Sequence, residues 1–217
     1  MNKTGIMVAA IGLMLGPSLA SAQDAGRATS WTGAYVGGAV GYAYGGDDRV
    51  AFDGDPALGI FRNKGPLARV HVGYSYEPVT DTVVGGQIGF AVGDVDDAFD
   101  AEGDRFAIEN DHVLSARAMV GRVLPHETLL YATAGLAQGR FTMSARNNPG
   151  PDGAEARFTS TGYTLGFGVE RQLGTGASVF GEYEYADFGK TSVTLGESTT
   201  QATPKWSSVS IGVNYRF

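Results

Sequence analysis

Apolar and polar residues alternate along the last nine positions of the chain. The apolar positions are Val209, Ile211, Val213, Tyr215 and Phe217, and the residues between them are small or polar. A period of two residues is that of a β-strand with one apolar and one polar face. The same pattern recurs in seven earlier segments. The sequence therefore predicts eight strands, at residues 31–44, 67–76, 82–92, 113–123, 129–141, 158–171, 177–188 and 206–217.

The connections between these strands alternate in length. Three are short enough for tight turns, and four are long. The short ones are residues 77–81, 124–128 and 172–176, and the long ones are residues 45–66, 93–112, 142–157 and 189–205. We expect an up-and-down antiparallel sheet with four long loops at one rim, and with three tight turns and both chain ends at the other rim.

The apolar face of each strand is predicted to meet lipid, because the opposite face carries charges that hydrocarbon would not accept. In residues 158–171, for example, Leu165 and Phe167 oppose Glu170. Only a closed sheet pairs every backbone N–H and C=O group inside a membrane. The predicted fold class is therefore all-β, an eight-stranded antiparallel up-and-down transmembrane β-barrel. A soluble lipocalin-like barrel or sandwich is the alternative, with the apolar residues turned inward.

The amino-terminal segment differs from the rest of the chain. Lys3 is followed by an apolar run at residues 5–15 and by the small residues Ala20-Ser21-Ala22. Such a run is too short to cross a hydrocarbon core of about 30 Å as a helix, and the pattern is that of a cleaved secretory signal peptide. We expect residues 1–22 to be a signal peptide and residues 23–217 to form the outer-membrane β-barrel domain.

The composition narrows the classes of function. The chain has no Cys, which excludes disulfides, thiolate metal sites and thiol nucleophiles. The formal net charge is −7 and no basic cluster is present, so no nucleic-acid partner is expected. Gly is abundant, at 33 of 217 residues, although Gly weakens strands. A narrow closed barrel explains this abundance, because small residues leave room for bulky neighbours in a crowded interior.

The polar faces of the strands carry charges that would lie inside the barrel. Three Arg and three Glu occupy inward positions at roughly matching depths, together with one His and one Gln. Buried charges must be paired, and an eight-stranded barrel is just wide enough to be filled by its own side chains. We expect an ion-paired plug, with a gated pore or proton path as the alternative. The inward polar residues are Arg69, His71, Gln87, Arg117, Glu170, Glu182, Glu184 and Arg216.

Candidate catalytic groups are few. A nucleophilic Ser needs a His beside it, and alternation places His112 and Ser115 on opposite faces of one strand. His71 points inward, and His126 lies in a short turn without a Ser. We therefore expect no enzyme activity, no catalytic residue and no cofactor. The acidic run at residues 94–109 lacks the spacing of a calcium loop, so no metal site is predicted, and binding of divalent ions by this run stays open.

Two further sets of residues suit contacts outside the barrel body. Apolar residues in the first long loop form either a contact site or a packing surface for neighbouring loops. Aromatic residues near strand ends or on lipid faces suit the girdles at the two membrane interfaces. The loop residues are Phe52, Leu58, Ile60 and Phe61, and the aromatic residues are Trp31, Tyr74, Tyr76, Tyr183, Tyr185, Trp206, Tyr215 and Phe217.

Four segments resemble the small outer-membrane β-barrel family, which includes OmpA-like transmembrane domains and opacity-type porin-family proteins. They are similar to the first, fifth, seventh and last strands of that family. The segments are Trp31-Thr32-Gly33-Ala34-Tyr35-Val36-Gly37-Gly38, Leu130-Tyr131-Ala132-Thr133-Ala134-Gly135-Leu136, Glu182-Tyr183-Glu184-Tyr185 with Asp187-Phe188-Gly189, and Val213-Asn214-Tyr215-Arg216-Phe217. The resemblance implies the outer membrane of a Gram-negative bacterium, and recognition of Tyr215 and Phe217 by the barrel-assembly machinery.

The resemblance implies a fold and a location but leaves the role open, because such barrels host several functions. We expect a non-enzymatic protein that supports envelope integrity and makes surface contacts through four long extracellular loops. The expected partners are outer-membrane lipid and lipopolysaccharide, the barrel-assembly machinery and host surface molecules. The alternatives are a surface-recognition protein (an adhesin, or a haem or complement binder), a lipid A-modifying enzyme and a small diffusion pore.

Overall fold

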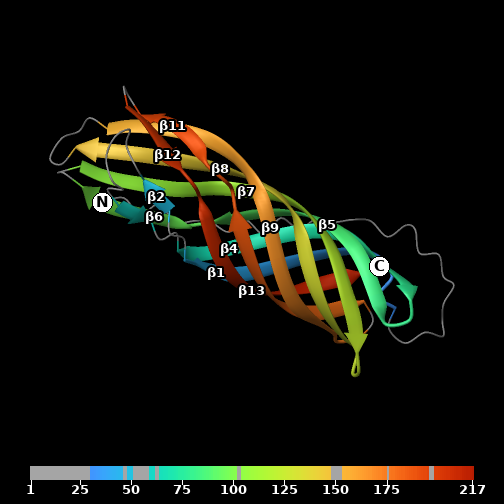
Figure 1. Cartoon of the computed structure of the whole chain (residues 1–217). Coiled ribbons are helices and arrows are strands. Elements are labelled where there is room, and N and C mark those ends of the chain that lie inside the picture. Colours follow the sequence, from blue (N-terminus) through green and yellow to red (C-terminus); the bar gives the residue numbers. More distant parts are fainter. Residues whose placement is uncertain are drawn as a thin grey trace.

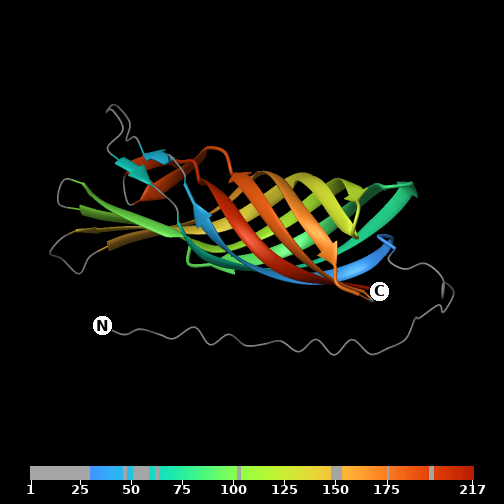
Figure 2. The same cartoon turned by 90° about the horizontal axis from the view of Figure 1, so that it is seen from below.

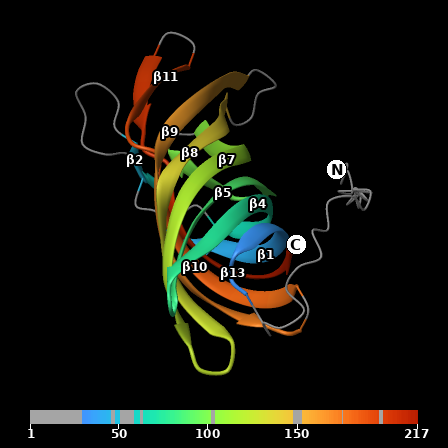
Figure 3. The same ribbon diagram turned by 90° about the vertical axis from the view of Figure 1, so that its right-hand side faces the viewer.

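Eight strands form a closed antiparallel barrel in the computed structural model (Figure 1). The model describes residues 30–45, 48–50, 59–61, 64–101, 104–147, 153–174, 176–195 and 198–217. The barrel strands are β1 (Gly33–Tyr44), β4 (Gly65–Val79), β5 (Thr82–Gly93), β7 (Asp104–Leu124), β8 (Thr128–Asn147), β9 (Gly153–Gln172), β10 (Ala177–Asp187) and β13 (Lys205–Arg216). Each pairs with the next, and β1 lies between β4 and β13, where it closes the sheet (Figure 3). The predicted eight-stranded barrel is confirmed.

Three of the strands are much longer than predicted. Strands β7, β8 and β9 have 21, 20 and 20 residues, whereas a tilted strand needs about 9–11 residues to cross a membrane. They project past the barrel body at the long-loop rim (Figure 2). The prediction treated residues 104–112, 142–147 and 153–157 as connections. It was wrong there because alternation marks a strand only where one face meets lipid, while backbone pairing continues without it.

Short strands also occupy parts of the long connections. Strand β2 (Asp48–Val50) pairs with β3 (Gly59–Phe61), β11 (Thr191–Leu195) pairs with β12 (Ser198–Ala202), and β6 (Asp96–Ala101) folds back on β7. The opposite rim carries three tight turns, as predicted. In two of them the backbone is left-handed at residues other than Gly, with φ of 64° at Asp81, 62° at His126 and 56° at Glu127.

The lipid-facing surface is apolar on every strand of the barrel. Large hydrophobic side chains are widely exposed, for example Val40 at 60%, Leu136 at 65% and Ile211 at 65%. The opposite positions carry the buried Arg, Glu, Ser and Thr side chains. This arrangement rules out the soluble alternative, in which the apolar residues would turn inward. Among the described residues, no helix is long and apolar enough to cross a bilayer.

Three inward aromatic rings each lie across a Gly on the neighbouring strand. Tyr35 is paired with Gly73, and Tyr131 with Gly168; the third pair is Phe180 with Gly212. A Cβ atom at Gly73 would lie 2.5 Å from Cζ of Tyr35, and one at Gly168 would lie 2.5 Å from Cζ of Tyr131. Since real Cβ atoms do not approach so closely, a side chain at these positions would displace the neighbouring ring, as expected for Gly residues in a crowded interior.

Candidate functional site

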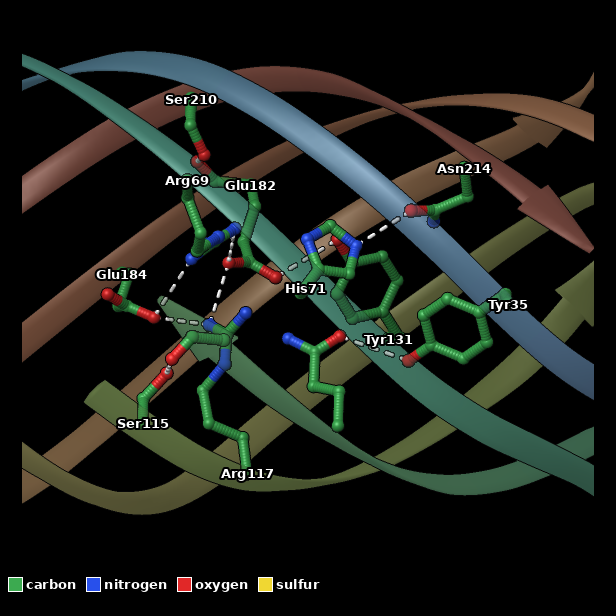
Figure 4. Close-up of polar contacts among 12 residues, drawn as sticks. Tyr35, Arg69, His71, Ser115, Arg117, Tyr131, Glu182, Glu184, Ser210 and Asn214 are labelled. Atoms are coloured by element: carbon green, nitrogen blue, oxygen red, sulfur yellow. Dashed lines mark hydrogen bonds and ion pairs between the residues drawn. The ribbon is translucent and has the colours of Figure 1, made fainter. Parts of the chain in front are cut away.

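Four charged side chains meet at mid-depth inside the barrel and form one ion cluster, made of Arg69 on β4, Arg117 on β7, and Glu182 and Glu184 on β10 (Figure 4). Nη2 of Arg69 lies 2.7 Å from Oε1 of Glu182, and Nη1 of Arg117 lies 2.8 Å from the same oxygen. Glu184 contacts both Arg side chains, at 3.3 Å from Nη1 of Arg69. The two Arg and two Glu thus share their charges in one group, as expected for an ion-paired interior.

Neutral side chains complete the coordination of the ion cluster. The Tyr131 hydroxyl donates to Oε2 of Glu182 at 3.1 Å. The Gln87 amide lies 3.0 Å from the Tyr35 hydroxyl. When the amide nitrogen of Gln87 donates to Tyr35, the amide oxygen accepts from Nε of Arg117 at 3.0 Å. Arg117 is 3% exposed and its charges are balanced within the cluster. A buried charge is tolerated only when it is paired and hydrogen-bonded in this way.

His71 takes a different place from the one predicted. It was expected among the charged residues, but its Nε2 atom lies 2.8 Å from Oδ1 of Asn214, across the β1 strand. Its ring packs edge-on against Tyr35 and Phe180, at centroid distances of 6.0 and 5.7 Å. The position of Gly37 between them allows this approach, because a Cβ there would collide with both His71 and Asn214. His71 therefore belongs to an aromatic layer below the ion cluster.

A second charged pair lies nearer the turn rim. Nη2 of Arg216 is 3.9 Å from Oε1 of Glu170, and the Ser178 hydroxyl donates to the same carboxylate. The Arg216 guanidinium also lies over the rings of Trp31 and Tyr35, at 5.1 and 5.4 Å from their centroids. Such stacking stabilises a cation at the face of an aromatic ring.

Two Trp residues were wrongly placed at the lipid interfaces. Trp31 and Trp206 are 2% and 6% exposed, and both point into the barrel. Trp31 joins an apolar cluster at the turn rim with Val83, Met119 and Leu129. Their position follows from alternation, because Trp206 has the parity of the inward residues Ser208 and Ser210. The odd or even position of a residue along its strand therefore predicts the direction of its side chain better than nearness to a strand end does.

Trp206 belongs to a cluster of buried aromatic rings at the long-loop rim, the aromatic plug. It packs against Phe188 and Phe141, with ring centroids 5.0 and 6.2 Å away. Phe158 stacks on Phe141 at 5.4 Å. Smaller side chains such as Val95 fill the spaces between these rings. The barrel interior is thus layered, with an aromatic plug, the ion cluster and a second apolar cluster in turn.

Two small cavities lie inside the described barrel. A cavity of about 40 Å³ lies between the aromatic plug and the ion cluster, lined by residues that include Trp206, Thr164 and Arg69. A second, of about 10 Å³, lies beside His71 and Gln87. The first has room for a few water molecules and the second for one at most. Water in the first would satisfy Nε of Arg69 and the Thr164 hydroxyl, which lack protein partners.

The remaining predicted aromatic residues lie on the outside of the barrel. Tyr74, Tyr76, Tyr215 and Phe217 are more than half exposed and gather at the turn rim. Tyr183 and Tyr185 face outward near the other rim, where the Tyr183 hydroxyl is 2.8 Å from that of Ser207 and Tyr185 donates to Asp187 at 3.2 Å. Tyr42, Tyr44 and Tyr163 share this rim and were missed, although their parity marks them as outward.

The loop candidates are described only in part. Phe52 and Leu58 lie outside the described residues, as does the predicted signal peptide at residues 1–22. Ile60 and Phe61 belong to the β2–β3 hairpin, of whose side chains nothing is described. Part of the acidic run forms the β6–β7 hairpin. Among the described residues, no group of three or more His, Asp or Glu is placed to hold a metal ion.

The two residues considered for nucleophilic chemistry are separated by the barrel wall. His112 stacks on the outward ring of Phe90 at 5.6 Å, whereas the Ser115 hydroxyl points inward, 3.5 Å from the carbonyl of Gly89. The predicted opposite placement is confirmed. Among the groups that sequence reasoning missed are Tyr35, Tyr131 and Asn214, whose inward parity was visible but whose partners depend on strands far apart in the sequence.

The closed barrel, its apolar belt and its paired interior define the class of a transmembrane β-barrel protein. The family of the outer membrane protein beta-barrel domain matches residues 9–217, and the chain belongs to this family. Its relatives are outer-membrane proteins of Gram-negative bacteria, and this chain is accordingly a protein of the outer membrane.

Two relatives show the range of similarity. The 31 kDa outer-membrane immunogenic protein of Brucella melitensis biotype 1 is 26% identical over 209 residues, which is 87% of this chain and 84% of that protein. The 22 kDa outer membrane protein of Rhizobium leguminosarum bv. viciae is 29% identical over 197 residues, covering 88% and 80%.

Two solved structures share the fold. Neisserial surface protein A (NspA) is 18% identical with a TM-score of 0.52, over 88% of this chain and 100% of that one. OprG from Pseudomonas aeruginosa is 13% identical with a TM-score of 0.55, over 86% and 96%. At these identities the likeness concerns the fold alone.

Proposed function

We propose that this chain is a non-enzymatic outer-membrane barrel that supports the integrity of the envelope, with its long loops as a surface for contacts. The observation that carries the proposal is the filled interior. The aromatic plug, the ion cluster and the second apolar cluster occupy successive layers of the interior, and the two cavities beside them measure about 40 and 10 Å³. A barrel filled in this way acts as a rigid body in the membrane rather than as a channel.

The same observations argue against two other roles. A diffusion pore needs a continuous aqueous path, and the ring contacts of Phe141, Phe188 and Trp206 occupy the outer mouth. A lipid A-modifying enzyme needs a paired nucleophile and base, and the barrel wall separates His112 from Ser115. Single-channel recording in planar bilayers is expected to show no stepwise conductance, and lipid A from a deletion strain is expected to keep its mass.

A surface-recognition role is the second candidate. Strands β7, β8 and β9 extend the barrel wall beyond the membrane as a hydrogen-bonded sheet, and this sheet offers a firm platform for a partner. The Brucella relative carries the name outer-membrane immunogenic protein, which suits a protein exposed at the cell surface. Host surface molecules are therefore proposed as partners of the long loops.

A loop-trimming experiment separates these roles. In the trimmed barrel, short turns join residue 44 to 65, 95 to 110, 141 to 158 and 188 to 204, so that the membrane-spanning body is kept together with Val95 and Phe188 of the aromatic plug. A deletion strain complemented with either form is then assayed for vesicle shedding and detergent sensitivity. We expect the trimmed barrel to restore the envelope. If only the full-length protein restores it, the loops carry the function. If neither form does, the envelope role is refuted.

A further inference from the structure

Three residues that precede β1 cross the mouth of the barrel at the turn rim. The Trp31 side chain is only 2% exposed, although it lies ahead of the first strand. It packs in one apolar cluster with Val83, Met119 and Leu129, which come from β5, β7 and β8. Residues 30–32 therefore fold inward over the interior, and we name them the strap.

Hydrogen bonds hold the strap at two distant points of the barrel wall. The Ser75 hydroxyl on β4 donates to the Trp31 carbonyl at 2.6 Å. The Gln172 amide on β9 donates to the Ser30 carbonyl at 3.4 Å. In the order of the sheet, β1, β13 and β10 separate these two strands. The strap thus spans the mouth between strands that are not neighbours.

The strap leaves the barrel wall where the first and last strands meet, near the chain end marked C in Figure 2. The pairing of β1 with β13 begins at Tyr35 and Arg216, and the N–H of Phe217 donates to the Ala34 carbonyl at 2.9 Å. Gly33 has a φ of 147°, and a Cβ atom there would lie 2.7 Å from the carbonyl oxygen of Phe217. Gly at this position lets the chain turn from β1 into the mouth.

The Trp31 ring also covers the charged residue at the end of β13. The Arg216 guanidinium lies 5.1 Å from the centroid of that ring. Its distance to Glu170 is 3.9 Å, and its Nε atom has no hydrogen-bond partner among the described residues. A cation is held more strongly over an aromatic face where water is excluded. The ring contact therefore ties β13 to the strap.

The contacts of the strap require a closed sheet. The strap is continuous with β1, whereas β13 and β9 lie across the junction of the first and last strands, the seam. Among the described strand pairs, the seam joins the residues farthest apart in the sequence. Such pairings form late, because they close the longest loop. A strap that bonds to both sides of the seam stabilises only the closed barrel.

We propose that the strap docks after β1 and β13 have paired, locks the seam and seals the turn-rim mouth against water. The Trp31 ring is the seal, and the bond from Ser75 to its carbonyl is the anchor. The lock slows the opening of the barrel without speeding its closure, because contacts absent from the transition state of folding change the unfolding rate. The strap acts in this way whatever the barrel does for the envelope.

Folding and unfolding rates of Trp31→Ala test the order of docking. The protein is folded into lipid vesicles by dilution from urea and unfolded by a jump to high urea, with fluorescence of the buried Trp206 as the signal. We expect unfolding to be at least thirtyfold faster and folding to stay within twofold. Folding slowed more than threefold, or unfolding accelerated less than threefold, overturns the proposal.

Leu129→Ala is the matched control for these rates. Leu129 is buried in the same apolar cluster, but it pairs with Val123 in the β7–β8 hairpin, whose strands are adjacent in the sequence. Contacts within such a hairpin form before the seam. This variant should therefore slow folding at least threefold, and a Trp31→Ala variant that slows folding by the same factor overturns late docking.

Thiol labelling tests the seal. The chain has no Cys, so Met119→Cys places a single thiol in the cluster that contains Trp31. A water-soluble methanethiosulfonate should label it at least tenfold faster when Trp31→Ala is added. Phe141→Ala, added instead, loosens the opposite rim and should change labelling less than twofold, because the ion cluster lies between. Equal acceleration by both, or none by Trp31→Ala, overturns the seal.

Ser75→Ala tests the anchor separately from the ring. It keeps Trp31 and removes the hydroxyl that donates to its carbonyl. We expect unfolding to be about fivefold faster and folding to be unchanged, since a buried carbonyl loses its donor only in the closed barrel. An unchanged unfolding rate overturns the anchor on β4.

Discussion

Replacing Arg117 by Met tests whether the ion cluster holds the barrel together. The substitution keeps the length of the side chain and removes one of the two positive charges at mid-depth. Glu182 would keep its contact with Arg69 at 2.7 Å and with Tyr131 at 3.1 Å. Glu184 would keep only Arg69, at 3.3 Å. Four balanced charges would become three, with one net negative charge inside the barrel.

The expected loss of stability follows from the burial of these groups. The side chains of Arg117 and Glu182 are 1% and 2% exposed, and that of Glu184 is 17% exposed. Removing one partner of a buried ion pair costs about 3–5 kcal/mol. Because Glu184 reaches some solvent and Glu182 keeps two donors, we expect the lower end, about 3 kcal/mol. With a urea dependence of about 2 kcal/mol per molar, the unfolding midpoint would fall by about 1.5 M.

The assay is urea unfolding of the barrel refolded into lipid vesicles. The two Trp residues of the chain, Trp31 and Trp206, are both buried inside the barrel and report on unfolding by fluorescence. Arg122→Met is the matched control, because Arg122 lies on the same strand and is exposed. The control should change stability by no more than about 0.5 kcal/mol.

A double variant distinguishes lost charge balance from lost packing. Arg117→Met/Glu184→Gln returns the cluster to neutrality, so it should be more stable than the sum of its single variants by about 1 kcal/mol or more. A loss below about 1 kcal/mol for Arg117→Met alone would refute the reasoning. Strict additivity in the double variant would show that the charges do not interact.

Four further predictions concern packing, turns and assembly. Phe141→Ala should cost about 3–5 kcal/mol in the same urea assay, because the ring is 2% exposed within the aromatic plug, and a loss under 1 kcal/mol would contradict that packing. Gly168→Ala should cost about 1–3 kcal/mol by displacing Tyr131, whereas Gly181→Ala, which has open space, should be neutral. Glu127→Gly should raise the free energy of unfolding by up to about 1 kcal/mol, because φ is 56° at Glu127 and Gly adopts this backbone without strain. An unchanged free energy of unfolding would argue against strain in the turn. Deleting Phe217, which donates its N–H to Ala34 at 2.9 Å, should lower insertion in cells as measured by heat-shifted outer-membrane protein, and normal insertion would contradict the assembly role.

The strands and their faces could be predicted because lipid imposes a strict alternation on them. The pattern of Val209, Ile211 and Val213 is visible in any single strand without knowledge of its neighbours. Beyond the membrane, lipid no longer imposes alternation on the residues, so the outer parts of β7, β8 and β9 were not predicted. Parity would also have placed Trp31 and Trp206 inside, had it been applied in preference to nearness to a strand end.

The partners inside the barrel could not be predicted in the same way. Inward parity is a property of one residue, whereas a contact such as Arg69 with Glu182 depends on the stagger of the strands across the whole barrel. The prediction therefore chose the right charges at matching depths, but it did not foresee that Arg69 and Arg117 would each contact both Glu182 and Glu184. His71 was grouped with them for the same reason, although Asn214 binds it across β1.

The ion cluster also determines how the barrel loses its structure. Its members come from β4, β7 and β10, and in the order of the sheet no two of these strands are adjacent. Hydrogen bonds between neighbouring strands can form one pair of strands at a time. The contacts of the ion cluster instead cross the barrel interior, so they form only when the barrel is closed. A sheet that has lost one strand would expose the charges to an open interior. Closure of the barrel and pairing of its charges therefore depend on each other, and this makes unfolding a single cooperative event.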